Sequence, residues 1–164
     1  MSSATTGGPL SKFSITREAP TSGDVRQLLD EHLALVRRYS PPGQVYALDA
    51  AELDTSDVSF FTLREENELL GIGALKQVEL FHVEIKSMYT AKAARGRGVA
   101  RAVLEHLLDV ARCQGYVRVS LQTGSMAAFA PARALYQSIG FRQCEPFGEH
   151  RRNPGTTCMT LELE

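Results

Sequence analysis

The chain has 164 residues, with 18 basic and 19 acidic side chains, so its formal charge at neutral pH is −1. This length favours one domain with a sizeable buried core. The balanced charge gives no large positive field, which argues against nucleic acid or a membrane surface as a partner and favours a small molecule. The oligomeric state is left open, with a homodimer as one option.

Three cysteines, Cys113, Cys144 and Cys158, are odd in number and form no Cys-x-x-Cys pair. This pattern favours buried thiols over a disulfide framework or a zinc site. No apolar run reaches the roughly 18 residues of a membrane span, and the Ser/Thr/Gly-rich start has no secretory apolar stretch. We predict a disordered tail over 1–12, a single domain over 13–164 and a cytoplasmic location.

Two helices are predicted in the first third of the domain. Apolar residues at helical spacing mark one from about Thr21 to Tyr39, where Thr21 and Asp24 fit a variant of the capping box. His32 adjoins its apolar face, and we interpret it as a packed or half-exposed residue rather than a catalytic one. A Pro-Pro-Gly run then ends the helix, and a second short helix is predicted around 50–53.

In the first 90 residues, four segments follow a strand pattern: 13–17, 58–63, 69–78 and 82–90. The second and third flank a charged turn and predict an antiparallel hairpin. Gly71 and Gly73 lie inside the third segment. Because no helix follows them, a bulge or a close packing contact explains them better than a phosphate loop.

The second half contains the clearest helix, over 98–114, with Gly115 after its end. This helix lies between strands 82–90 and 117–122, which indicates a right-handed parallel crossover within an otherwise antiparallel sheet. The remaining predicted elements are a helix over 131–138, a closing strand pair over 141–147 and 157–163, and a connecting loop over 151–155. The fold class is therefore α+β, with a mixed sheet flanked by helices.

Bare backbone and a helix start meet just after strand 82–90. Gly96 and Gly98 lack the Cβ atoms that would keep a ligand from the backbone, and the helix beginning near Gly98 directs its unpaired N–H groups to the same place. A diphosphate fits such a site. A Rossmann fingerprint needs a third glycine where Arg101 stands, and the Gly-Lys-Ser/Thr of a P-loop is absent from the sequence.

Two motifs carry a family resemblance. The sequence Arg-x-x-Gly-x-Ala over 95–100 resembles the acetyl-CoA loop of the GNAT superfamily of N-acetyltransferases. The segment 132–141, Ala-Arg-Ala-Leu-Tyr-Gln-Ser-Ile-Gly-Phe, is similar to the family pattern Ala-x-x-Leu-Tyr-x-x-x-Gly-Phe. The resemblance extends from about Phe13 to the C-terminus and is greatest to single-domain bacterial members, for which the family name does not specify the acceptor.

The resemblance implies acetyl-CoA as the co-substrate and no metal. In this family the two parallel strands splay apart, and the pantetheine arm pairs with the strand edge while backbone N–H groups hold the pyrophosphate. The side chains of Arg97 and Arg101 would either screen the phosphates or form a solvated basic face. The implied cofactor-binding residues are Met88, Tyr89, Thr90, Arg95, Gly96, Arg97, Gly98, Val99, Ala100 and Arg101.

Two catalytic residues follow from the same resemblance. Tyr136 matches the tyrosine whose hydroxyl lies near the thioester sulfur, and its usual pKa of about 10 suits protonation of a departing thiolate. The alternative is a core tyrosine. Glu84 matches the glutamate with which histone-acetylating members deprotonate the amine, although pairing with Lys86 would make it structural. Phe129 replaces an Asn found in many members, so one hydrogen bond to the cofactor is expected to be missing.

Strand alternation gives the neighbours of the candidate base. Without a bulge, Glu84, Lys86 and Met88 share one face, and Val83, Ile85 and Tyr89 share the other. His82 and Glu79 are weaker candidates for the base.

The predicted reaction is direct transfer of the acetyl group from acetyl-CoA to a primary amine of a small molecule in a ternary complex. The alternatives are an acyl-CoA sensor or structural domain without turnover, and a phosphate-binding protein. In the family, the loops over 39–46 and 148–153 adjoin the acceptor. In the second loop, His150, Arg151 and Arg152 would suit a small amine that bears a carboxylate or phosphate. Alternatively, Arg151 and Arg152 only solvate the tip of a hairpin. The implied substrate-binding residues are Tyr39, Tyr46, Arg151 and Arg152.

Overall fold

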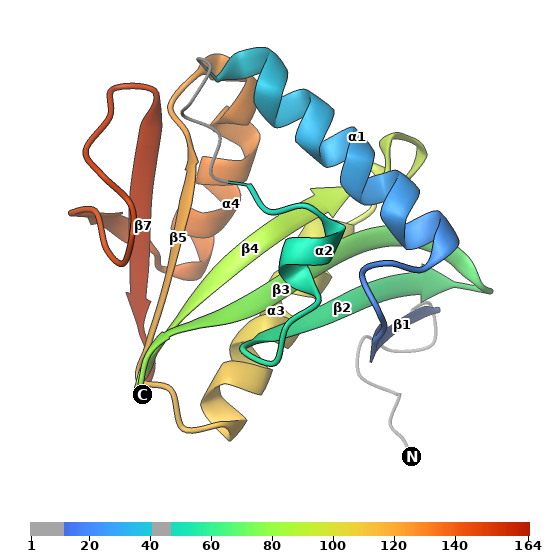
Figure 1. The fold of residues 1–164 in the computed structure, drawn as a ribbon, viewed down its shortest axis with the longest axis horizontal. Helices are drawn as coiled ribbons and strands as arrows, with labels where there is room; N and C mark the ends of the chain where they lie inside the picture. The colour runs from blue at the N-terminus through green and yellow to red at the C-terminus, as the bar shows by residue number, and fades with distance from the viewer. Residues whose placement is uncertain (1–11, 41–46) are drawn as a thin grey trace.

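Seven strands of the described chain form one mixed sheet in the order β1-β2-β3-β4-β5-β7-β6 (Figure 1). The structure is a computed structural model that describes residues 12–40 and 47–164, so the predicted tail lies outside the described residues except for Lys12. The strands are β1 (Phe13–Arg17), β2 (Val58–Glu65), β3 (Glu68–Glu79), β4 (His82–Thr90), β5 (Arg118–Gly124), β6 (Arg142–Cys144) and β7 (Thr156–Glu162). The helices are α1 (Gly23–Tyr39), α2 (Ala50–Leu53), α3 (Val99–Cys113) and α4 (Ala130–Ile139), with 3-10 turns η2 (Lys92–Ala94) and η3 (Ala127–Phe129).

The strand directions confirm the predicted fold class. β4 and β5 run parallel, and the other strand pairs within the described residues are antiparallel. α3 connects the parallel pair, as expected for a crossover. The last strand, β7, inserts between β5 and β6, an order that the sequence pattern does not specify. In the part of the chain that is described, no helix is long and apolar enough to cross a membrane.

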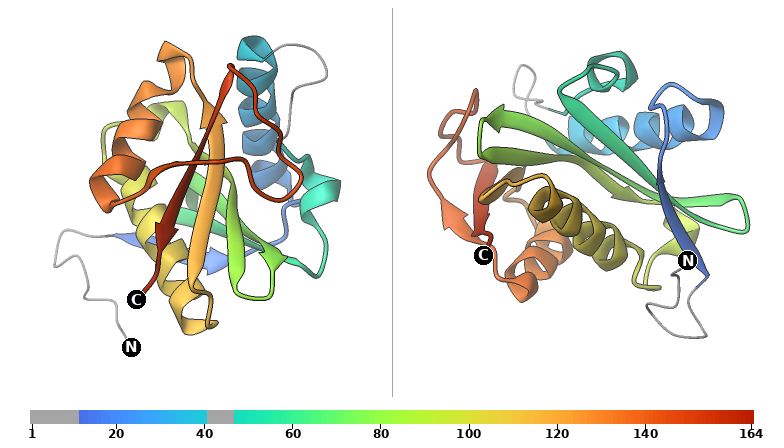
Figure 2. Two further views of the ribbon diagram at one scale, coloured as in Figure 1. Left: turned by 90° about the vertical axis from the view of Figure 1, so that its left-hand side faces the viewer. Right: turned by 90° about the horizontal axis from the view of Figure 1, so that it is seen from below.

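Helices cover both faces of the sheet, with α1 and α2 on one side and α3 and α4 on the other (Figure 2). Two glycines let α3 lie close to β3, because a Cβ atom at Gly71 would stand 2.6 Å from Cγ1 of Val99, and one at Gly73 would stand 2.8 Å from Cγ1 of Val103. A larger residue at either position would push the helix away. The packing explanation of these glycines is therefore confirmed, and it fixes the start of α3 beside β4.

A bulge at Ser87 interrupts the alternation of β4. The register with β3 shows that Ser87 and Met88 together oppose Gly73, and Ser87 has a φ of 58°. The extra residue exchanges the faces of the next two side chains. Met88 packs with the α3 side of the core, and Tyr89 packs with the α1 side, next to His32. The faces predicted for Met88 and Tyr89 without a bulge are therefore wrong.

Several element ends differ from the predicted ones. The hairpin turn is shorter than expected, since Glu66 and Asn67 alone bend the chain, both with positive φ. β6 ends at Cys144 rather than at 147, and a longer loop leads to β7. The predicted capping box at Thr21 and Asp24 is wrong, because Ser22 is the N-cap and makes no side-chain cap bond.

Candidate active site

The cleft lies where the two parallel strands separate. The pairing between the two strands joins only His82–Ile85 of β4 to Arg118–Leu121 of β5. β4 continues to Thr90, and β5 continues to Gly124. Beyond the paired part, the strand edges no longer share hydrogen bonds. A cavity of about 610 Å³ lies at this place and is lined by residues 84–90 of β4 and 121–124 of β5.

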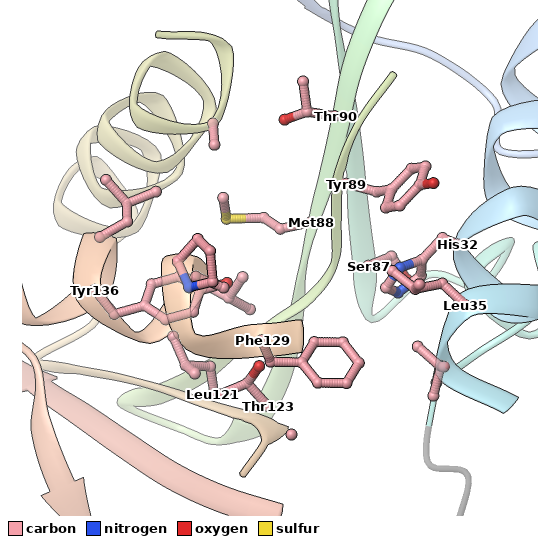
Figure 3. A pocket seen from close by; sticks show the side chains of 18 of the residues that line it. His32, Leu35, Ser87, Met88, Tyr89, Thr90, Leu121, Thr123, Phe129 and Tyr136 are labelled. Atoms are coloured by element: carbon pink, nitrogen blue, oxygen red, sulfur yellow. The ribbon is translucent and has the colours of Figure 1, made fainter. Parts of the chain in front are cut away.

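Side chains from both faces of the sheet line this one cavity. His32, Leu35 and Val36 come from α1, whereas Val99 and Tyr136 come from α3 and α4 on the opposite face. In Figure 3, His32 and Leu35 lie across the cavity from Tyr136, with Met88 and Phe129 between them. The cleft therefore passes through the sheet, so two ligands can approach each other from opposite sides.

The loop before α3 offers backbone donors at one end of the cleft. Gly96 and Gly98 have φ values of 80° and 81°, and a Cβ atom on either would face open space. Gly98 is the N-cap of α3 and, having no side chain, satisfies none of the N–H groups of the first turn. The N–H groups of Val99, Ala100 and Arg101 thus remain available, with the positive end of the helix dipole, for an anion.

Three arginines of this loop and the first turn of α3 have different partners. Arg95 lies over the Tyr89 ring, with its Cζ 5.5 Å from the ring centroid, and also donates to the Tyr89 hydroxyl. Arg101 donates to Ser138 at 2.9 Å, and both Arg95 and Arg101 line the cavity. Arg97 instead forms an ion pair with Glu65 at 2.7 Å and is not part of the lining. Two of the three side chains can therefore face phosphates.

Tyr136 projects from α4 into the cavity and is only 7% exposed. Its ring packs against Phe141, with the ring centroids 5.8 Å apart. Burial raises the pKa of Tyr136 to about 12, since the phenolate would lose its hydration. The hydroxyl therefore stays protonated at neutral pH and can donate a proton.

Glu84 is a buried carboxylate with two hydrogen-bond donors beside it. Its Oε2 accepts from Nε2 of His150 at 2.6 Å and from Nζ of Lys86 at 3.3 Å. Burial opposes ionisation, but the hydrogen bond from His150 and the charge of Lys86 outweigh it and lower the pKa of Glu84. Glu84 lines the main cleft and also a neighbouring cavity of about 310 Å³ beside Glu52 and Lys76. Glu84 therefore lies between the two cavities.

The acceptor side differs from the sequence-based expectation. Tyr39 contacts Phe129, which lines the cleft, with ring centroids 5.9 Å apart. Tyr46 lies outside the described residues. Arg151 is exposed, and Arg152 pairs with Glu145 on the surface. Neither arginine lines the cleft.

The fold brings together three residues whose positions here do not follow from the sequence pattern. His150, expected in the acceptor loop, reaches Glu84 from the loop before β7. Ser87, which had no expected role, lies at the bulge, and His32, expected to be a packed or half-exposed residue, lines the cleft from α1. The period of α1 does place His32 next to the apolar face, but it does not show what that face covers. Within the described ranges, no group of three or more His, Cys, Asp or Glu side chains is arranged to hold a metal ion.

Comparison with known proteins agrees with this geometry. The model of the acetyltransferase (GNAT) family matches residues 25–141. The Bacillus subtilis (strain 168) protein named Uncharacterized N-acetyltransferase YsnE is 43% identical over 143 residues, which cover 87% of this chain and 95% of that protein.

Two solved structures share the fold. An acyl-CoA N-acyltransferase structure from Klebsiella pneumoniae has a TM-score of 0.75 at 24% identity and covers 93% of this chain and 98% of that chain. A GNAT family acetyltransferase from Elizabethkingia anophelis with acetyl-CoA bound has a TM-score of 0.66 at 18% identity, with coverages of 93% and 99%. The chain therefore belongs to the GNAT family and is an acetyl-CoA-dependent N-acetyltransferase.

Proposed function

We propose that the protein transfers an acetyl group from acetyl-CoA directly to the primary amine of a small molecule, with both substrates bound at once. The observation that carries this proposal is the cleft through the sheet, which residues of α1 line on one face and residues of α3 and α4 on the other. A donor and an acceptor entering from opposite faces would meet at the separated strands, without a covalent enzyme intermediate.

Acetyl-CoA fits the α3 side of this cleft. The backbone N–H groups of 95–101 would bind its pyrophosphate, because two glycines leave the loop open and no cap competes for the donors. The main-chain groups of 88–90 would pair with the pantetheine arm, since this part of β4 has no partner in β5. Phe129 stands in the lining without an amide group, so the arm would depend on backbone contacts there.

In the reaction, the amine nitrogen attacks the thioester carbonyl, a C–N bond forms, and the C–S bond breaks. Backbone N–H groups at the bulge near Met88 would polarise the carbonyl. Tyr136 would protonate the departing thiolate, which its protonated state at neutral pH supports. Glu84 would accept the proton that the amine loses, through water, and the neighbouring cavity offers a route from Glu84 to solvent.

The deciding experiment measures binding and turnover separately. Isothermal titration with acetyl-CoA, CoA and ATP tests the donor site, and we expect acetyl-CoA and CoA to bind far more tightly than ATP. Release of thiol during a screen of amines then tests turnover. Tight acetyl-CoA binding without thiol release for any amine would favour the alternative, an acyl-CoA sensor. Equal binding of ATP would point to a general phosphate site.

A further inference from the structure

Three residues that line the cavity carry a buried polar atom without a hydrogen bond to any described residue. The atoms are Nδ1 of His32, on α1, Oγ of Ser87, at the bulge of β4, and Nε2 of Gln122, on β5. The side chain of Gln122 also interacts with the Cys158 thiol, which leaves His32 and Ser87. Buried polar groups are normally paired, because leaving one unpaired costs its full desolvation. Two such atoms on one wall of a ligand cleft therefore indicate groups that are kept for a ligand.

The wall around these atoms is mostly apolar. Leu35, Val36, Tyr89 and Phe129 supply aliphatic and aromatic surface, and the ring of Tyr89 lies 5.3 Å from that of His32. Among the charged side chains nearby, Glu84 and Lys86 are paired with each other, and Arg95 donates to the hydroxyl of Tyr89. The binding of a ligand group that fills this part of the cleft is therefore stabilised mainly by apolar contacts.

The protonation state of His32 restricts the chemistry of the ligand further. Burial lowers the pKa of His32 to about 4, so the imidazole is neutral at physiological pH. Nδ1 of a neutral imidazole donates or accepts one hydrogen bond, and a hydroxyl donates one and accepts up to two, but neither group attracts an anion by charge. Arg151 and Arg152 do not line the cleft, so a carboxylate or phosphate on the acceptor would have to draw Lys86 away from Glu84 or Arg95 away from Tyr89.

Resting on the proposed function, we infer that His32 and Ser87 form the polar part of the acceptor subsite, which takes a small amine with an apolar or aromatic body and one uncharged hydrogen-bonding group. An aromatic amino-acid amide has this chemistry. Its ring would lie against the apolar wall, its amide would bond His32 and Ser87, and its amine would point to the thioester.

The test uses four amines, namely phenylalaninamide, 2-phenylethylamine, phenylalanine and spermidine, with thiol release as the readout. We expect phenylalaninamide to have the highest kcat/KM. In His32→Leu and Ser87→Ala, the KM for phenylalaninamide should rise about threefold to tenfold, as for one lost hydrogen bond. The KM for 2-phenylethylamine, which has no amide, should change less.

Rescue and control variants separate binding from folding. His32→Asn places an amide nitrogen near the Nδ1 position and should restore part of the KM that His32→Leu loses. Ser87→Gly removes the hydroxyl but suits the positive φ, so it should match Ser87→Ala in KM while being more stable. His106→Leu makes the same exchange as His32→Leu at a partly buried histidine of α3 that does not line the cleft, and its KM values should equal those of the wild type.

Three outcomes would overturn the inference. They are unchanged KM values for all four amines in both His32→Leu and Ser87→Ala, a highest kcat/KM for phenylalanine or spermidine, and acetyl-CoA binding without thiol release for any of the four amines. If the wild-type protein does not bind acetyl-CoA, the proposed function itself is wrong. Failure of the inference and failure of the proposed function are therefore distinguishable.

Discussion

Nε2 of His150 lies 2.6 Å from Oε2 of Glu84, although 66 residues separate the two in the sequence. Both side chains are almost fully buried, at 5% and 8% exposed. The contact ties the loop before β7 to the middle of β4, at the edge of the cleft. It also keeps the carboxylate ionised, which a proton acceptor requires, while making it a weaker base than a free glutamate.

Glu84→Gln should lower kcat by about 10²-fold, the lower range for loss of a general base. The shape of the side chain is kept, so the affinity for acetyl-CoA, measured by titration calorimetry, should stay within about twofold of the wild type. His150→Gln, which retains a donor for Glu84, should keep more activity than His150→Leu. Wild-type turnover in Glu84→Gln would assign the carboxylate a structural role.

The same carboxylate should affect stability at low pH. Its pKa in the folded protein lies below the usual 4.5, so it stabilises the fold above about pH 4.5, and this contribution is lost as the pH falls through the folded pKa. In urea unfolding between pH 7 and pH 3, the free energy of unfolding should fall more steeply below pH 4.5 for the wild type than for Glu84→Gln. Parallel curves for the two proteins would contradict this linkage.

Tyr136→Phe should reduce kcat by about 10²-fold or more if the hydroxyl protonates the thiolate in the transition state. The affinity for acetyl-CoA should be nearly unchanged, because the aromatic ring remains. Tyr116→Phe is the matched control, since Tyr116 packs against the same core but does not line the cleft. Equal kcat values for Tyr136→Phe and Tyr116→Phe would show that Tyr136 has a packing role only.

Gly98→Ala should weaken acetyl-CoA binding by about tenfold or more, because a Cβ atom would occupy the open space above the loop donors. Gly115→Ala is an unusually close control, since Gly115 has a φ of 87° and also faces open space, but it follows the far end of α3. Each change should lower the free energy of unfolding by about 1–2 kcal/mol through backbone strain. Similar acetyl-CoA affinities in the two variants would refute the anion site.

Arg64→Ala should lower the free energy of unfolding by about 1–3 kcal/mol, since Arg64 donates to both Glu18 and Asp24 and so joins β2 to the chain before α1 and to its first turn. Arg112→Ala removes one exposed ion pair, with Asp109, and should cost under about 0.5 kcal/mol. Urea unfolding at pH 7 measures both. Equal losses would show that the Arg64 contacts contribute no more than a surface pair.

Much of the fold was predictable because its signals are local. The ends of β1, β4 and α2 agree with the predicted 13–17, 82–90 and 50–53, since alternation, helical spacing and turn residues act over a few positions. The glycine loop before α3 and the position of Tyr136 were also predictable from the sequence. They depend on short motifs, and the family model confirms the family that these motifs indicated.

Features that depend on distant partners were not predictable. Asp24 pairs with Arg64, 40 residues away, instead of serving the predicted capping box. Ser87 bulges opposite Gly73, where α3 leaves space for Met88 but not for a larger residue on β3. The insertion of β7 between β5 and β6 likewise depends on pairing between strands that are far apart in the sequence.

The sequence by itself determined the element types, the mixed α+β class and the glycine loop before α3, because each follows from side-chain periodicity or backbone freedom within one short segment. Only the tertiary structure decided which side chains meet in the cleft. It brought His150 to Glu84, placed His32 and Ser87 in the lining of the cleft, and left Arg151 and Arg152 outside that lining. Contacts between residues distant in sequence are set by strand order, register and helix packing, and no local pattern encodes these.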